Sequence, residues 1–119
     1  MSISRAEQIN LAAIDWPEHV AIPAERVIIG TPAASTVILD DTASHQLGLW
    51  QVTPGEFHTE HAGYLEYIHI AHGSGQLVDQ SGLITELAPG ITVLMQRGWK
   101  GRWIVTETIT KVYTIITTT

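Results

Sequence analysis

The stretch Trp99-Lys100-Gly101-Arg102-Trp103-Ile104-Val105-Thr106-Glu107, together with the alternating run at residues 109–116, decides the fold of this chain. Both segments are rich in β-branched and aromatic residues, which are enriched in β-strands. We therefore expect residues 100–106 and 109–117 to form a pair of strands.

Short strand-like runs continue upstream of this pair. Turn residues separate them, among them Pro54-Gly55, Gly73-Ser74-Gly75 and Pro89-Gly90. Eight further strands are expected, at residues 26–29, 36–39, 46–53, 56–61, 65–72, 76–79, 84–87 and 92–95. Many short strands with no helical pattern between them predict an all-β sandwich or barrel.

The composition narrows the class of protein. The chain has 119 residues, of which 45% are hydrophobic and 15% charged, so we expect one folded domain with a substantial core. A formal net charge of −6 argues against binding to nucleic acid. We find neither a membrane-spanning run nor a signal-peptide pattern, and expect a cytoplasmic protein that does not act at a membrane. The absence of cysteine excludes disulfides and thiolate zinc sites.

Residues 1–22 differ from the rest and are expected to form an N-terminal arm. Ser4 and Glu7 fit a capping box, and Ile9, Ala12 and Ala13 would then belong to a short helix that ends before Trp16-Pro17. The alternative is an arm without a helix, lying across the barrel or a neighbouring subunit.

A block of glycines with one histidine and one glutamate precedes the C-terminal strands. Gly55 is followed after five residues by His61, and Glu66 is followed after six residues by Gly73. This spacing resembles the first sequence motif of the cupins, which are small double-sheet jelly rolls. Cupins commonly hold a metal ion through three histidines and one glutamate. In this resemblance His61 and Glu66 match two ligand positions, whereas Gly63 stands in place of the second histidine.

The downstream block is similar to the second cupin motif. Gly90 begins it, and Gln96-Arg97-Gly98 follows after five residues. Gly101 then stands where the third histidine is expected, and Val105 where an asparagine is expected. The resemblance therefore implies a cupin that lacks two of the four metal ligands.

Three segments are similar to one branch of the cupins. They are Trp50-Gln51-Val52-Thr53-Pro54-Gly55-Glu56-Phe57, Gly98-Trp99-Lys100-Gly101-Arg102-Trp103 and Lys111-Val112-Tyr113. They resemble the small-cupin family grouped with the (S)-ureidoglycine aminohydrolase cupin domain, which also includes an ethanolamine-utilisation protein. The resemblance covers about residues 23–116. It implies an all-β double-stranded β-helix, the cupin jelly roll, at residues 23–119.

Strand alternation predicts which histidines can reach the interior. If Glu66 points into the barrel, Ile68, Ile70 and His72 share its face, whereas His69 points outward. Six residues of strand place His72 about 20 Å from Glu66. One metal ion cannot bridge that distance.

His61 and Glu66 are therefore the two polar side chains expected to meet inside. Two protein donors are fewer than the three or four of a typical transition-metal site. We favour no cofactor. The alternative is a divalent transition metal held by His61 and Glu66 and completed by another side chain, such as His45, Gln51 or Tyr64.

An aromatic wall beside this pair would suit a small ligand. If Gly101 points inward, Trp103 and Val105 do too, and the small residues Gly63 and Gly101 leave space for a ligand. The expected ligand-binding residues are His61, Tyr64, Glu66, Trp103 and Met95. If the site is catalytic, Glu66 is the general acid or base, and His61 orients it or shares its proton.

Three functions are compatible with this sequence. We favour binding of a small polar metabolite in the barrel without a tightly held metal. The alternative is a metal-dependent hydrolase or isomerase that resembles ureidoglycine aminohydrolase, and a further alternative is a structural dimer module. A homodimer is expected in each case, because an apolar chain with few charges has little protection on its sheet edges.

Overall fold

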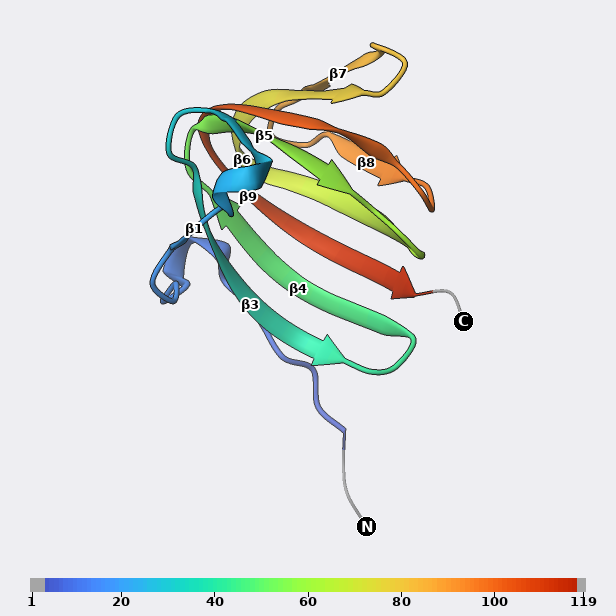
Figure 1. Ribbon diagram of the computed structural model, residues 1–119. Helices are drawn as coiled ribbons and strands as arrows, with labels where there is room; N and C mark the ends of the chain where they lie inside the picture. Colours follow the sequence, from blue (N-terminus) through green and yellow to red (C-terminus); the bar gives the residue numbers. More distant parts are fainter. Residues whose placement is uncertain (1–3, 118–119) are drawn as a thin grey trace.

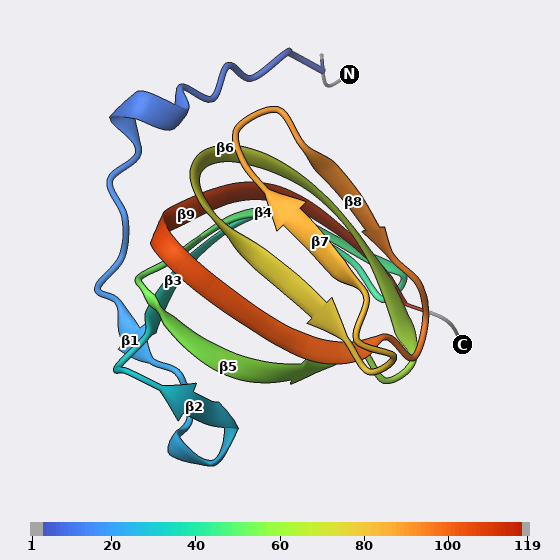
Figure 2. The same cartoon turned by 90° about the horizontal axis from the view of Figure 1, so that it is seen from above.

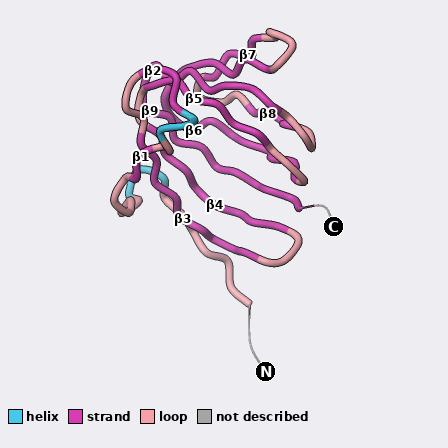
Figure 3. The backbone as a smooth tube through the Cα atoms, in the orientation of Figure 1, coloured by secondary structure: helices cyan, strands magenta, loops and turns pink. Residues whose placement is uncertain are grey.

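The computed structural model describes residues 4–117 and confirms the predicted all-β jelly roll. Strands and two short 3-10 turns follow one another along the chain (Figures 1 and 3). The elements are η1 (Leu11–Ala13), β1 (Val20–Ala21), η2 (Ala24–Arg26), β2 (Val27–Ile29), β3 (Ala33–Asp41), β4 (His45–Val52), β5 (Gly55–Glu60), β6 (Tyr64–Asp79), β7 (Ile84–Leu87), β8 (Thr92–Met95) and β9 (Lys100–Thr117).

Two long strands, β6 and β9, run through both layers of the barrel. The broad layer is ordered β1, β3, β4, the C-terminal part of β9, the N-terminal part of β6, and β8. The narrow layer is ordered β2, β5, the N-terminal part of β9, the C-terminal part of β6, and β7. All of these pairs are antiparallel. Figure 2 shows how the layers curl around a common interior.

The prediction that β6 and β9 are each two separate strands was wrong. The β6–β9 pairing continues through register shifts between Ile70 and Gly75, which bend the ladder from one layer into the other. Gly73 has φ +88°, and a Cβ there would meet the carbonyl oxygen of Thr108. Glycine therefore allows a bend, where a turn was predicted.

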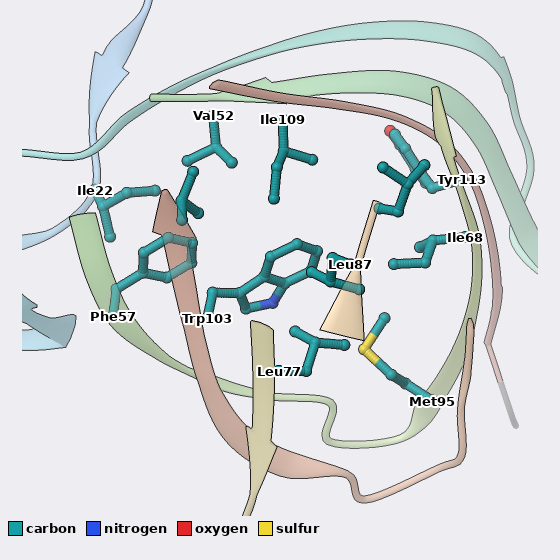
Figure 4. Packing of buried hydrophobic residues seen from close by; sticks show 12 residues of the cluster. Ile22, Val52, Phe57, Ile68, Leu77, Leu87, Met95, Trp103, Ile109 and Tyr113 are labelled. Carbon is teal, nitrogen blue, oxygen red and sulfur yellow. The ribbon is translucent and has the colours of Figure 1, made fainter. Parts of the chain in front are cut away.

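The core fills the space between the layers, with Trp103 near its centre (Figure 4). The Trp103 and Phe57 rings stack with centroids 6.3 Å apart and planes at 5°. The prediction that Trp103 and Val105 face inward is confirmed, since both are buried. The remaining buried apolar members are Ile22, Val52, Ile68, Ile70, Leu77, Leu87, Met95, Ile109 and Tyr113.

The N-terminal segment does not form the predicted helix. Its helical part is the three-residue turn η1, and Asn10 caps it by accepting a hydrogen bond from the Ala12 amide at 3.1 Å. Ser4 and Glu7 precede this turn in exposed chain without regular structure, so no packed face supports a longer helix. None of the helical segments within residues 4–117 is long and apolar enough to cross a membrane.

The arm lies along the outer side of the broad layer (Figure 2). The Ser35 hydroxyl donates to the Pro17 carbonyl oxygen at 2.7 Å, and His19 Nε2 lies 2.9 Å from Gln51 Oε1. These contacts attach residues 17–19 to β3 and β4 of the same chain.

Candidate functional site

Three polar side chains meet in the interior of the barrel. Glu66, Lys111 and His61 are only 6%, 5% and 1% exposed. The Lys111 ammonium donates to Glu66 Oε2 at 2.7 Å, while His61 Nε2 lies 3.4 Å from Glu66 Oε1. The structure thus brings together the predicted pair, His61 and Glu66, and adds a lysine.

Lys111 was not among the site residues predicted from the sequence. The available signal was its position between Ile109 and Tyr113 in an alternating run, which places all three on the buried face of β9. A lysine in phase with core residues is unusual, since lysine is almost never fully buried without a partner. Here that partner is Glu66.

Aromatic rings surround the buried ammonium. Lys111 Nζ lies 4.3 Å from the ring centre of Trp50, 4.7 Å from that of Trp103 and 5.8 Å from that of Tyr113. Ring faces attract a cation, so they offset part of its loss of hydration. Burial lowers the pKa of Lys111, and the adjacent Glu66 carboxylate opposes this shift.

His61 is held between aromatic side chains just beyond the end of β5. Its ring stacks on Tyr64 at 4.7 Å between centres and is tilted against Trp99 at 5.4 Å. Its backbone N–H donates to the Trp99 carbonyl oxygen at 2.9 Å. Within residues 4–117, the buried Nδ1 atom of His61 has no hydrogen-bond partner.

Burial lowers the pKa of His61, since the barrel disfavours the imidazolium. Glu66 acts in the opposite direction, and Lys111 lowers the pKa of His61 further. His61 is therefore mainly neutral at pH 7.

We expect a pH dependence of stability that comes from this histidine. Because its pKa is lower in the folded state than the unfolded value of about 6.5, the unfolded state binds more protons as the pH falls through that range. The contribution of His61 to the free energy of unfolding is therefore retained above about pH 6.5 and lost as the pH falls below that value. Between about pH 7 and pH 5, the free energy of unfolding of His61→Phe should fall less steeply than that of the wild type. The difference in slope should be up to about 1.4 kcal/mol per pH unit.

Urea denaturation at a series of pH values measures this slope. The exposed His69, changed to Phe in a control variant, should leave the slope as in the wild type. Parallel pH profiles for the wild type and His61→Phe would show that His61 does not carry the effect.

A cavity of about 270 Å³ lies beside the three polar side chains. This volume is slightly below the range of pockets for drug-sized molecules and suits a small metabolite. Of the predicted ligand-binding residues, the cavity wall contains His61, Tyr64, Glu66 and Trp103. The other wall residues are Ile22, Arg26, Thr36, Gln46, Trp50, Phe57, Thr59, Lys111, Tyr113 and Ile115.

Met95 lies apart from this wall, contrary to its predicted role. It is the cross-strand neighbour of Glu66 and lies on β8, but its buried side chain packs in the apolar cluster near Leu77 (Figure 4).

The two glycines at the missing histidine positions differ from each other. A Cβ on Gly63 would have no atom within 4 Å, although φ of +82° disfavours other residues there. At Gly101, a Cβ would lie 2.6 Å from the Trp99 ring and 2.5 Å from the Val78 carbonyl oxygen. The expectation of free space at Gly101 was wrong, because the Trp99 indole occupies it.

The donors present do not fit a tightly held transition metal. Within residues 4–117 no three His, Cys, Asp or Glu side chains are grouped closely enough to bind a metal ion. His61 and Glu66 supply two donors, but the ammonium of Lys111 lies against one carboxylate oxygen and would repel a second cation.

Of the other side chains considered as possible metal ligands, Tyr64 lies on the cavity wall and the rest lie away from it. His45 Nε2 lies 2.6 Å from Asp40 Oδ2 near the surface, and Gln51 donates to Thr110. His69 and His72 are exposed. The predicted inward phase of His72 was wrong, because the register shift after Ile70 interrupts the alternation.

A larger groove of about 940 Å³ adjoins the cavity. Arg26, Thr59 and Tyr64 line both spaces and therefore mark the mouth of the cavity. Arg26 is fixed there by hydrogen bonds to the His58 carbonyl oxygen and to Thr59 Oγ1, each 3.0 Å long. Arg26 was not predicted as a site residue, since no motif in the sequence marks it.

The curled two-layer sheet and the polar cluster inside it define a small cupin. A family model described as the EutQ-like cupin domain matches residues 39–113. The chain therefore belongs to the EutQ-like cupin family, as the motif resemblance implied. No relative was found among the curated proteins.

Solved structures share this fold at low sequence identity. A DUF861-family protein from Pseudomonas syringae pv. tomato superposes with a TM-score of 0.76 at 23% identity, covering 87% of this chain and 45% of that one. The EutQ protein of Clostridium difficile gives 0.64 at 14% identity, covering 73% of this chain and 64% of that one. Ectoine synthase from P. lautus gives 0.64 at 15%, with coverages of 82% and 73%. This chain thus spans less than two thirds of the first two proteins.

Proposed function

We propose that this protein binds a small polar metabolite in its barrel, without a tightly held metal. The observation that carries the proposal is the Glu66–Lys111 ion pair on the wall of a cavity. The pair supplies a carboxylate and an ammonium as polar contacts, and Trp50, Trp103 and Tyr64 supply apolar area. Ligand pockets commonly combine apolar walls with a few polar groups in this way.

The alternative interpretation is that the Glu66–Lys111 ion pair has a purely structural role. Such a pair gains little stability, since the cost of desolvating both charges offsets much of their attraction. It would also need no open space beside it. The adjoining cavity, with its mouth at Arg26, supports the ligand-binding proposal over a vestigial site. The ammonium of Lys111 beside Glu66 argues against the metal-dependent hydrolase or isomerase.

A screen of polar metabolites by ligand-observed NMR tests this proposal. We expect wild-type protein to bind at least one compound and Thr36→Trp to lose it, because Thr36 lines the cavity and an indole there would fill the space. Leu39→Trp, on the same strand but away from the cavity, should retain binding. Absence of any ligand, or equal binding by both variants, would contradict the proposal.

We also propose that the protein forms a homodimer through the outer face of the broad layer. Register places Leu47, Thr114, Tyr67 and Leu94 in one row across β4, β9, β6 and β8. Tyr67 and Leu94 are 43% and 53% exposed. Three of these four residues carry exposed apolar or aromatic side chains, which are common at interfaces, and a two-fold dimer is the commonest assembly that would cover such a row.

Tyr67→Glu is expected to convert the dimer to a monomer. The substitution places a carboxylate in the middle of the apolar row, where pairing would bury it. Sedimentation velocity at tens of micromolar protein measures the change. Leu83→Glu, in the exposed turn before β7, should remain dimeric. A monomeric wild type at this concentration would contradict the proposal.

A further inference from the structure

Lys111 is a primary amine on the wall of the cavity, and the chain has only one other lysine, Lys100. The two lysines lie in opposite environments. Lys111 is buried against Glu66, whereas the Lys100 side chain is 51% exposed and lies 3.6 Å from Glu60 on the surface. A buried lysine beside a carboxyl group is an arrangement suited to nucleophilic chemistry on carbonyl compounds.

We propose that Lys111 forms an imine with a small aldehyde or ketone that enters the cavity, with Glu66 transferring the protons. This inference rests on the proposed function, since it names the class of ligand that the cavity would take. It assigns Lys111 as the covalent attachment point and Glu66 as the general acid and base.

The charges beside Lys111 favour an uncharged carbonyl group. The Glu66 carboxylate and the Lys111 ammonium cancel each other, and His61 is mainly neutral, so these three side chains together carry little net charge. The Arg26 guanidinium is a further charge on the wall and lies at the mouth of the cavity. The Trp50 and Trp103 rings offer apolar contact for the carbon atoms of such a ligand. The cavity volume of about 270 Å³ suits a short-chain ligand.

The first step frees the amine. Lys111 passes one proton over 2.7 Å to Glu66 Oε2, which gives a neutral amine and a carboxylic acid. Because this transfer removes two charges from a buried site, the loss of hydration favours it. The same burial lowers the pKa of Lys111, although the Glu66 carboxylate opposes this shift.

The remaining steps balance without a further reactant. The nitrogen lone pair attacks the carbonyl carbon, the C=O π bond breaks, and a proton moves from nitrogen to oxygen to give a neutral carbinolamine. Glu66 returns its proton to the hydroxyl group, the C–O bond breaks, and water leaves as the C=N bond forms. The products are a protonated imine, a carboxylate and one water, so the positive charge stays beside Glu66.

Reductive trapping of wild-type protein tests this inference. Propanal and cyanoborohydride would convert an imine into a stable propyl adduct, and peptide mass spectrometry would locate it. Simple exposure predicts modification of Lys100 and none of Lys111. The inference predicts the reverse, with more adduct at Lys111 than at Lys100, because burial lowers the pKa of the Lys111 amine. Modification of Lys100 with Lys111 untouched would overturn it.

Variants then assign the roles. Lys111→Arg keeps a positive charge but forms no imine, so the adduct at that position should disappear while Lys100 labels as before. Glu66→Gln should slow trapping at Lys111 and change its pH profile, because the amide cannot take the proton. A Glu66→Gln profile identical to the wild type would remove Glu66 from the mechanism.

One further measurement separates this inference from the proposed function. Propanal without reductant is followed by ligand-observed NMR, with Thr36→Trp as the blocked control. Binding of propanal without an adduct at Lys111 overturns the imine and leaves the cavity as a binding site. Binding of another metabolite, but not of propanal, would also overturn the imine and leave the cavity as a binding site. Absence of every ligand overturns both.

Discussion

Lys111→Met is expected to lower the free energy of unfolding by about 3–5 kcal/mol, the usual cost of leaving one buried charge without its partner. Glu66 is buried, and the Lys111 ammonium at 2.7 Å is its closest cation. Methionine keeps most of the volume of the side chain but provides no charge. Urea denaturation at pH 7, with the midpoint and slope fitted for each variant, gives the difference.

The chain contains a matched control for this variant. Lys100→Met removes the exposed pair with Glu60, in which the atoms lie 3.6 Å apart, and should cost no more than about 1 kcal/mol. The double variant Lys111→Met/Glu66→Gln should recover part of the loss, because no charge is then left alone in the interior. Equal costs for Lys111→Met and Lys100→Met would show that the interior pair is not energetically coupled.

Trp103→Ala is expected to cost about 3–5 kcal/mol, the usual range for truncating a buried aromatic side chain. Trp103 is near the centre of the core and contacts Phe57, Trp50 and the Lys111 ammonium. Its loss would leave a void in the core and would remove one ring face from the ammonium. Thermal and urea unfolding both report the change.

Leu83→Ala is the control for Trp103→Ala. Leu83 is exposed in the turn before β7 and lies outside the proposed dimer face, so its truncation should change the free energy of unfolding by no more than about 0.5 kcal/mol. Trp103→Phe, which keeps a ring beside Lys111, should have a cost between those of these two variants. A cost for Trp103→Ala as small as that for Leu83→Ala would contradict the central position of Trp103 in the core.

The fold could be predicted because strand alternation is a local property. Residues 109–117 and the motif spacing around Gly55 and Gly73 place most strands close to their observed positions. What could not be predicted was the continuity of β6 and β9. The glycine-rich segment Gly73-Ser74-Gly75 has the composition of a turn. It forms a bend within β6 because it pairs with β9, which is distant in the sequence.

The site was predicted in part. The motif resemblance selected His61 and Glu66, and the structure places them 3.4 Å apart. Lys111 lies 45 residues from Glu66 in sequence, so no local pattern connects the two. The indole of Trp99 fills the space at Gly101 for a similar reason, since strand phase does not fix the direction of a side chain in the preceding loop.

The central claim is that Lys111 supplies the interior cation beside Glu66, where a metal would otherwise be expected. The most direct test is elemental analysis of protein purified without chelator. The arrangement of His61, Glu66 and Lys111 predicts transition metal far below one ion per chain, with the same low content in Glu66→Gln. A content close to one ion per chain that is lost in Glu66→Gln would contradict the claim.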